Sequence, residues 1–168
     1  MQIENSTPAD LETIFRFYSA ATQYQKKRFP DNTWPQFERS LVETEIAENR
    51  QFKLLEDGEI VCVWAVTYND PELWQDDDGE SSLYIHRIAT SPEARGRQYV
   101  KQIVQWARQF AKDKRFIRMD TCGENTRLIQ HYQNCGFEFL GIKKLKDAGS
   151  LPAHYHGAEV CYFQIALP

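Results

Sequence analysis

No stretch of the 168-residue chain approaches the ~18 consecutive apolar residues of a membrane-spanning helix. Residues 1–5 (MQIEN) contain neither a basic region nor an apolar region, so we expect no signal peptide and a cytoplasmic location. Acidic residues outnumber lysine and arginine by 24 to 20, which gives a formal net charge of -4. Because phosphate backbones and anionic membrane surfaces attract an excess of basic residues, we expect neither nucleic acid nor a membrane as a partner.

The chain also lacks cysteines that lie close to one another in sequence. The chain has four cysteines, which are Cys62, Cys122, Cys135 and Cys161. They are far apart in sequence, with no C-x-x-C pair and no histidine at zinc-ligand spacing. We therefore expect four reduced thiols, mostly buried as small apolar groups, and no metal. His154 and His156 form a His-x-His pattern, but no carboxylate or cysteine lies near them in sequence to complete a metal site.

The residues that are present have the ordinary balance of a globular protein, with 42% hydrophobic and 26% charged. The chain has no repeat, low-complexity tract or linker, so we expect one domain spanning residues 1–168. Periodicity predicts strands at 2–5, 52–55, 60–68, 81–89, 116–121, 137–144 and 159–166, and helices from 7–8, from about 35, at 97–112 and at 125–135. Asp57-Gly58 is a strong hairpin signal. This order predicts an α+β or mixed α/β fold with helices packed on a central sheet.

Residues 84–98 (YIHRIATSPEARGRQ) predict a strand, a short loop and the start of a helix. Free backbone N–H groups at a helix N-terminus bind phosphate readily, and the helix dipole favours negative charge there. Gly96 lets the backbone approach a ligand closely, and Arg95 and Arg97 add positive charge. Taken alone, the segment is equally well explained as a turn before a surface helix.

A second segment, residues 119–137, ends a strand and begins a helix. Asn125 occupies the helix start, Tyr132 lies two turns later on nearly the same face, and Gly136-Phe137 follow. Together the two segments resemble the GCN5-related N-acetyltransferase (GNAT) superfamily, whose pattern is a strand, Arg-Gly-x-Gly-x-Gly or Ala, a helix, a strand, and then Asn, Tyr and Gly-Phe. The resemblance covers the last half of the chain closely and the first half in element order only.

This resemblance implies a mostly antiparallel, twisted sheet of about six or seven strands with about four flanking helices, and an acetyl-CoA-dependent N-acetyltransferase. It implies that the strand ending at Ile88 and Ala89 separates from its neighbour and binds the pantetheine arm, and that Asn125 contacts the cofactor. The loop amides would hold the CoA diphosphate, and they belong to Arg95, Gly96, Arg97, Gln98, Tyr99 and Val100. Where the family usually has Gly and then Gly or Ala, this chain has Gln98 and Val100, which predicts weaker CoA binding than usual.

Acetyl transfer to an amine requires a neutral amine, a polarised carbonyl and a proton for the departing thiolate. A primary amine with a pKa near ~10.4 is charged at neutral pH, so a base or a water relay is needed. The resemblance implies that Tyr132 reaches the thioester sulfur as the general acid, and a backbone N–H near Ala89 would stabilise the oxyanion. The helix pattern alone favours Tyr132 as an aromatic residue of the core.

The general base has two candidates on the strand at 81–89. If this strand is regular, Glu80, Ser82, Tyr84 and His86 share one face. Some family members place a catalytic Glu at the position of Ser82, which cannot act as a base. Glu80 and His86 flank that position, and His86 has the better ordinary pKa of about 6.5. A structural role for His86 and a water relay without a single base stay open.

Two further regions bear on the acceptor. Residues 70–80 contain six carboxylates and no cation, which would attract a cationic amine or simply form a solvated loop. The aromatic residues of the first two helices are expected mostly in the core, with one or two beside the acceptor pocket, and they are Tyr18, Tyr24, Phe29, Trp34 and Phe37. We interpret residues 152–157 as a loop beside that pocket.

Three functions remain open from the sequence. The favoured hypothesis is direct transfer of the acetyl group from acetyl-CoA to the primary amine of a small molecule. The alternatives are acetylation of a protein lysine or N-terminus, and a non-catalytic CoA-binding module, which the incomplete glycine pattern keeps open. The sequence identifies neither the acceptor nor the oligomeric state, for which a homodimer is one option.

Overall fold

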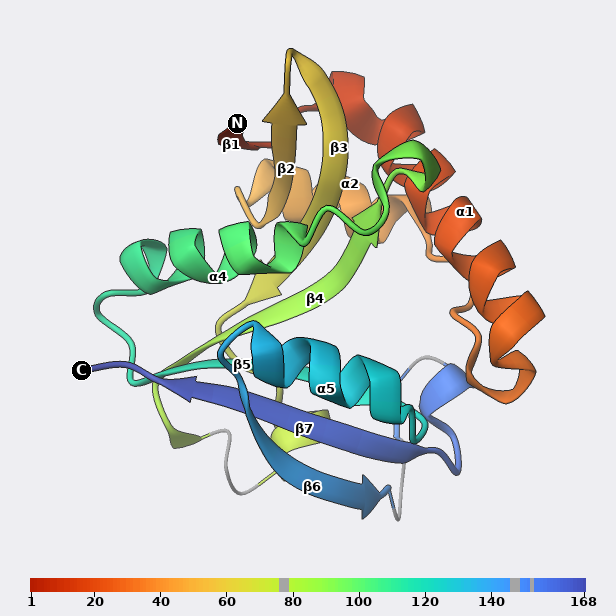
Figure 1. The fold of residues 1–168 in the computed structure, drawn as a ribbon, viewed down its shortest axis with the longest axis vertical. Coiled ribbons are helices and arrows are strands. Elements are labelled where there is room, and N and C mark those ends of the chain that lie inside the picture. The colour runs from red at the N-terminus through yellow and green to blue at the C-terminus, as the bar shows by residue number, and fades with distance from the viewer. Residues whose placement is uncertain (76–78, 146–148, 152) are drawn as a thin grey trace. The chain divides into compact units, whose positions relative to one another are not determined.

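The computed structural model describes residues 1–75, 79–145, 149–151 and 153–168 (Figure 1). The chain divides into two compact units, the first formed by Met1–Val66 and His86–Tyr99 and the second by Thr67–Ile85 and Val100–Pro168. Strand β4 (Ser82–Thr90) and helix α4 (Tyr99–Phe110) run through both units. The expectation of one domain over the whole chain stays a prediction.

Unit 1 contains strands β1 (Gln2–Asn5), β2 (Gln51–Glu56) and β3 (Glu59–Thr67), in the spatial order β1-β2-β3-β4. Both β1–β2 and β2–β3 are antiparallel. The predicted hairpin is confirmed at Asp57 and Gly58, whose φ angles are 53° and 85°. Two successive left-handed residues match the twist of the flanking strands, which is why Asp-Gly suits this turn.

The helices of unit 1 are α1 (Leu11–Arg28) and α2 (Arg39–Ala47). A short 3-10 turn, Pro8–Asp10, leads into α1, and the backbone N–H of Thr7 donates to the carboxylate of Asp10 at 2.7 Å. Helix α2 begins later than the expected start near Pro35, so Phe37 precedes it. One buried cluster of this unit consists of Leu11, Ile14, Phe17, Tyr18, Val42, Ile46, Val63 and Ala89.

Unit 2 contains β5 (Phe116–Cys122), β6 (Glu138–Lys144) and β7 (Glu159–Ala166), in the spatial order β4-β5-β7-β6. The β4–β5 pair is parallel, whereas β5–β7 and β6–β7 are antiparallel. Helix α5 (Thr126–Asn134) ends before Gly136, whose φ of 101° confirms it as the left-handed stop. A buried cluster of this unit consists of Leu73, Trp74, Tyr84, Leu145, Val160 and Tyr162.

The sequence missed one helix, α3 (Pro71–Trp74), which lies in the acidic segment 70–80. Its Leu73 and Trp74 are buried, so this part of the segment is not a solvated loop. Residues 76–78 of that segment, and residue 152 of the loop at 152–157, lie outside the described residues.

The predicted fold class is confirmed. Seven strands and flanking helices form a mixed α/β fold in which most strand pairs are antiparallel. All four cysteines are free, and Cys62, Cys135 and Cys161 are buried. Within the described parts of the chain, no helix has both the length and the apolar character needed to span a membrane.

Candidate active site

The structure corrects the predicted arrangement of residues before β4. Strand β4 begins at Ser82, so Glu80 lies outside it and does not belong to a regular strand face. The carboxylate of Glu80 forms an exposed ion pair with Arg115 instead. The Ser82 hydroxyl donates to the backbone carbonyl of Glu80 at 2.9 Å, which holds the two residues in a local turn. Glu80 therefore has the environment of a surface carboxylate.

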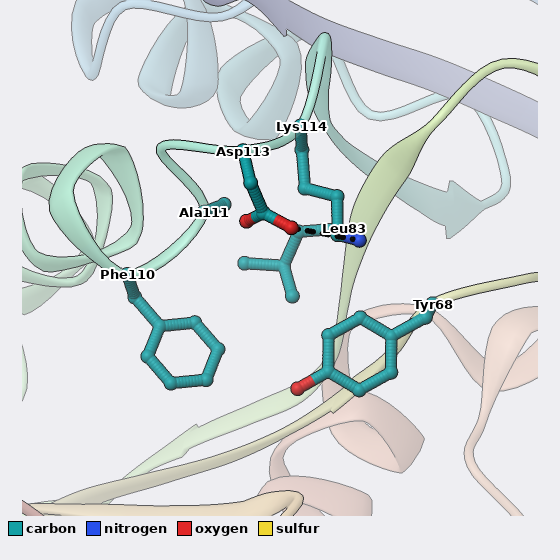
Figure 2. A pocket seen from close by; sticks show the side chains of 6 residues that line it. All are labelled: Tyr68, Leu83, Phe110, Ala111, Asp113 and Lys114. Carbon is teal, nitrogen blue, oxygen red and sulfur yellow. Dashed lines mark ion pairs between the residues drawn. The ribbon is translucent and has the colours of Figure 1, made fainter.

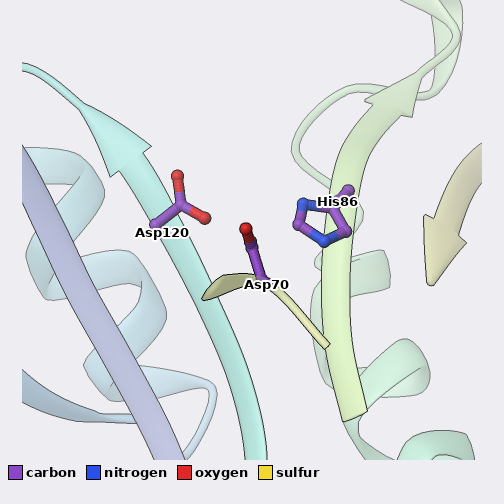
Figure 3. Close-up of side chains that lie close together, drawn as sticks. All are labelled: Asp70, His86 and Asp120. Carbon is purple, nitrogen blue, oxygen red and sulfur yellow. The ribbon is translucent and has the colours of Figure 1, made fainter. Parts of the chain in front are cut away.

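His86 lies on β4 and is half-buried (Figure 3). Burial lowers the pKa of His86 to about 3, and the positive charges of Arg87 and Arg50 act in the same direction. An imidazole with this pKa is neutral at physiological pH but holds an added proton weakly. Its environment therefore favours the structural interpretation of His86 over the base role.

The next residue, Arg87, distorts β4. Its φ of 51° is left-handed, which is rare for a residue with a long side chain. Its guanidinium forms an ion pair with Glu45, whose side chain is only 2% exposed, and lies 5.3 Å from the ring centroid of Phe37. Burial acts to lower the pKa of Arg87, but the neighbouring Tyr18 and Glu45 raise it further, so the guanidinium stays protonated. A buried ion pair thus holds the strand in its irregular conformation directly before Ile88 and Ala89.

The β4–β5 ladder is short. It pairs residues 82–84 with residues 116–118, although β4 continues to Thr90 and β5 to Cys122. Ile88 and Ala89 therefore lie beyond the part of β4 that pairs with β5. A β4–β5 ladder that ends before these two residues is expected if their backbone groups bind a ligand.

The predicted cofactor loop follows β4. A 3-10 turn at Pro92–Ala94 precedes Gly96, whose φ is 84°, and Gln98, whose φ is 58°. A Cβ added at Gly96 would meet nothing within 4 Å, so glycine is favoured here by its backbone conformation rather than by crowding. Helix α4 begins at Tyr99, two residues later than expected. Gln98 therefore keeps the left-handed conformation that glycine adopts easily.

The side chains of this loop bind to the rest of unit 1. Arg97 forms an ion pair with Glu56, and the same carboxylate accepts a hydrogen bond from the Tyr99 hydroxyl at 2.9 Å. The guanidinium of Arg95 lies 4.7 Å from the ring centroid of Tyr24. These contacts fix the loop, but they also partly offset the positive charge that Arg97 was expected to offer to phosphates.

In unit 2, Asn125 and Tyr132 belong to the N-terminus and the body of α5. Asn125 is the N-cap, because its side-chain oxygen accepts a hydrogen bond from the backbone N–H of Leu128 at 3.2 Å. Tyr132 is 8% exposed, and its ring centroid lies 5.2 Å from that of Phe163 and 6.2 Å from that of Phe137. The ring of Tyr132 is thus a core group, and the acid role of its hydroxyl stays a prediction.

Asp120 is a residue that the sequence analysis did not single out. It lies on β5, and its carboxylate accepts a hydrogen bond from the Tyr155 hydroxyl at 2.8 Å. Burial raises the pKa of Asp120 from 3.8 to about 6, although the hydrogen bond from Tyr155 acts in the opposite direction. An oxygen of Asp70 lies within 4.8 Å of an oxygen of Asp120 (Figure 3). Asp120 is thus a half-buried carboxylate that titrates near neutrality, as a general base should.

A signal for Asp120 was present in the strand pattern. Ile117 and Met119 alternate with Arg118 and Asp120 along β5, so the charged pair shares one face of the strand. The sequence did not show that this face is covered by aromatic residues. Arg118 is only 4% exposed, and its guanidinium lies 4.6 Å from the ring centroid of Trp74.

The His-x-His pattern does not form a metal site among the residues that the structure describes. Burial lowers the pKa of His154 to about 4. A ring nitrogen of His156 lies 3.0 Å from the backbone carbonyl of Leu151. Neither histidine joins two other metal-ligating side chains of the described ranges in one group. Tyr155, which lies between them, is the residue of this loop that contacts Asp120.

Comparisons with known proteins agree with this geometry. A curated relative from Bacillus subtilis, described as the uncharacterized N-acetyltransferase YesJ, is 35% identical over 74 residues, which are 43% of this chain and 41% of that protein. The chain therefore matches less than half of that relative's length.

Two solved structures share the fold. A GNAT-family acetyltransferase from Listeria monocytogenes superposes with a TM-score of 0.76 at 22% identity, over 99% of this chain and 94% of its own. YncA from Salmonella typhimurium is described as a putative acetyltransferase with its cofactor acetyl-CoA. It superposes with a TM-score of 0.68 at 12% identity, over 99% of this chain and 94% of its own. The family model described as Acetyltransferase (GNAT) family matches residues 11–137, most of the sequence, and the chain belongs to that family.

Proposed function

We propose that this chain transfers the acetyl group of acetyl-CoA to the primary amine of a small molecule by direct attack on the thioester. Membership of the GNAT family supports the reaction class. The Salmonella structure with acetyl-CoA bound supports the choice of acyl donor. The observation that carries the proposal is Asp120, a half-buried carboxylate whose pKa is about 6.

The loop between β4 and α4 fits an anionic cofactor. Its left-handed residues Gly96 and Gln98 turn the chain directly before a 12-residue helix. The first N–H groups of a helix have no partner within the helix and can bind phosphate oxygens. In this proposal the amides of residues 95–100 hold the diphosphate, and the backbone of Ile88 and Ala89 together with Asn125 bind the pantetheine arm. Acetyl-CoA supplies the acetyl group as an activated thioester.

Asp120 is the proposed general base, in place of Glu80 and His86. Glu80 is an exposed carboxylate paired with Arg115, and the pKa of His86 is too low for it to hold a proton. Asp120 is ionised above pH ~6 and accepts the proton that the amine loses as its nitrogen bonds to the acetyl carbon. Tyr155 orients the carboxylate through its hydrogen bond.

Tyr132 is the proposed general acid. As the C–S bond breaks, its hydroxyl gives a proton to the departing thiolate. The ordinary pKa of tyrosine, about 10, exceeds the ~8.5 of a thiol, so the hydroxyl is protonated before the reaction and regains its proton afterwards. The rings of Phe137 and Phe163 hold the Tyr132 ring in place.

A cationic small molecule is the favoured acceptor because the chain carries a net charge of -4, with six carboxylates between residues 70 and 80. The test uses acetyl-CoA with separate pools of polyamines, amino sugars, amino acids and lysine-containing peptides. Release of free CoA thiol that depends on a small amine is the expected result. Turnover on peptides alone would contradict the small-molecule assignment. Thermal stabilisation by CoA without turnover on any pool would indicate a binding module.

The base is tested by Asp120→Asn, which keeps the side-chain shape and an acceptor for Tyr155. We expect kcat to fall at least 100-fold, as is typical for loss of a general base. In the unchanged protein kcat should rise as the pH increases through about 6, and in the variant this rise of kcat should be absent. Asp57→Asn, in the exposed hairpin, is the matched control and should leave both quantities unchanged. If kcat of Asp120→Asn still rises with pH near 6, Asp120 is not the base.

A further inference from the structure

A hollow of about 300 Å³ opens on the surface of unit 2 (Figure 2). Its lining residues are Tyr68, Leu83, Phe110, Ala111, Asp113 and Lys114. They come from the segment after β3, the start of β4, the last residue of α4 and the segment between α4 and β5. None of them has a role in the proposed acetyl transfer. A volume at the low end of the range for ligand sites suits a molecule of amino-acid size.

Part of the lining of the hollow is apolar. Leu83 and Ala111 are buried, with exposed fractions of 0% and 2%. The rings of Phe110 and Tyr68 lie on either side of Leu83 (Figure 2), and they are 39% and 47% exposed. A stack with Trp106, with ring centroids 4.7 Å apart, fixes the ring of Phe110. A flat apolar group entering between Phe110 and Tyr68 would cover aromatic surface that now faces water.

The rim of the hollow offers charges of both signs. Asp113 and Lys114 form an ion pair with a separation of 3.3 Å, and the side chain of Asp113 is 70% exposed. The ammonium group of Lys114 also lies 5.4 Å from the ring centroid of Tyr68. The side chain of Lys114 is less exposed, at 24%, but ion pairs that solvent reaches contribute little to stability, so a ligand that carries both charges can exchange partners with this pair at small cost.

We propose that this hollow binds a small aromatic zwitterion of the aromatic amino-acid class. The aromatic ring inserts between Phe110 and Tyr68 over Leu83. The ligand's ammonium group pairs with Asp113, and its carboxylate pairs with Lys114. A ligand with a single charge would satisfy only one side of the rim, and a ligand without a ring would leave the aromatic surface exposed. The proposed binding site is additional to the sites for acetyl-CoA and the acceptor amine.

The test is a titration of the isotope-labelled chain with L-phenylalanine, without acetyl-CoA, followed by amide NMR shifts. We expect saturable shifts centred on residues 110–114, with a dissociation constant on the order of 1 mM for a ligand of this size. Phenylethylamine lacks the carboxylate, 3-phenylpropionate lacks the amine and alanine lacks the ring. Each should bind at least fivefold more weakly.

Variants at the rim separate this proposal from unspecific contact. Asp113→Asn and Lys114→Gln should each weaken L-phenylalanine binding at least fivefold and leave acetyl transfer unchanged. Glu138→Gln, at an exposed position on β6, is the matched control and should bind as the unchanged chain does. Equal binding by the three truncated ligands, shifts centred elsewhere, or full binding by both rim variants would overturn the proposal.

Discussion

Gln98 and Arg87 are unusual residues because both adopt left-handed φ angles, at 58° and 51°. Each conformation costs roughly 1–2 kcal/mol for a residue with a side chain. At Arg87 the ion pair with Glu45 offsets this cost. At Gln98 the side chain is exposed, so the loop keeps a glycine-like shape at the expense of some stability.

This strain can be measured at Gln98. Gln98→Val should lower the free energy of unfolding by about 1–2 kcal/mol, because a β-branched side chain fits a left-handed φ poorly. Gln98→Gly should relieve the strain and bind acetyl-CoA at least as tightly as the unchanged chain. Urea denaturation and calorimetric titration with acetyl-CoA give the two quantities. A stable Gln98→Val variant would mean that the φ angle at this position is ordinary in solution.

The hydroxyl of Tyr132 can be separated from its ring. Tyr132→Phe keeps the contacts with Phe137 and Phe163 but removes the proposed proton donor. We expect kcat to fall at least tenfold, about 1.4 kcal/mol, with little change in acetyl-CoA affinity. Tyr68→Phe removes an exposed hydroxyl elsewhere in unit 2 and serves as the control. Unchanged turnover in Tyr132→Phe would remove this residue from the acid role.

At the scale of elements, the proposed binding of acetyl-CoA depends most on the turn that joins β4 to α4. Its conformation is set locally by Gly96 and Gln98 and from a distance by Glu56, which binds Arg97 and Tyr99. A negative charge placed in this turn would oppose the phosphates, whereas a neutral side chain of the same shape would not.

Gly96→Asp and Gly96→Asn test this expectation as a matched pair. Both side chains tolerate the left-handed φ of 84° about equally, and a Cβ at this position meets open space. The aspartate variant should therefore bind acetyl-CoA at least tenfold more weakly than the asparagine variant, because only its charge repels the diphosphate. The measurement is calorimetric titration at low salt. Equal affinities would show that the turn does not hold the diphosphate.

The elements themselves were largely predictable, because their signals are local. The Asp57-Gly58 turn, the Asn125 cap and the Gly136 stop all lie where the sequence places them. Helix α3 was missed because a four-residue helix has no periodicity to detect. The candidate base was missed because the raised pKa of Asp120 depends on burial, which comes from residues distant in sequence.

For the whole molecule, Asp120 links the proposed function to stability. Between pH 3.8 and about 6 the folded chain holds a proton on Asp120 that the unfolded chain has lost. The folded state therefore binds more protons, and the contribution of this group to stability falls as the pH rises through that window. Above pH 6 the cost reaches about 3 kcal/mol.

Asp120→Asn should therefore be more stable than the unchanged chain at pH 7.5, by up to about 3 kcal/mol, although it should be inactive. The difference should shrink below about 1 kcal/mol at pH 4, where the folded chain keeps the proton and the unfolded chain has lost it only in part. Urea denaturation at both pH values measures it, with Asp57→Asn as the control. A variant that is less stable at pH 7.5 would show that the ionised carboxylate stabilises the fold.

The burial of the cysteines gives the molecule internal reporters of opening. Burial raises the pKa of Cys62 in unit 1 to about 12, and it raises the pKa of Cys122, Cys135 and Cys161 in unit 2 as well. Because only the thiolate is alkylated, the folded chain should react slowly with iodoacetamide. Mass spectrometry identifies which cysteine is modified at each time, and this gives the time at which the unit containing that cysteine opens. A single time course therefore shows whether the two units open together or one after the other.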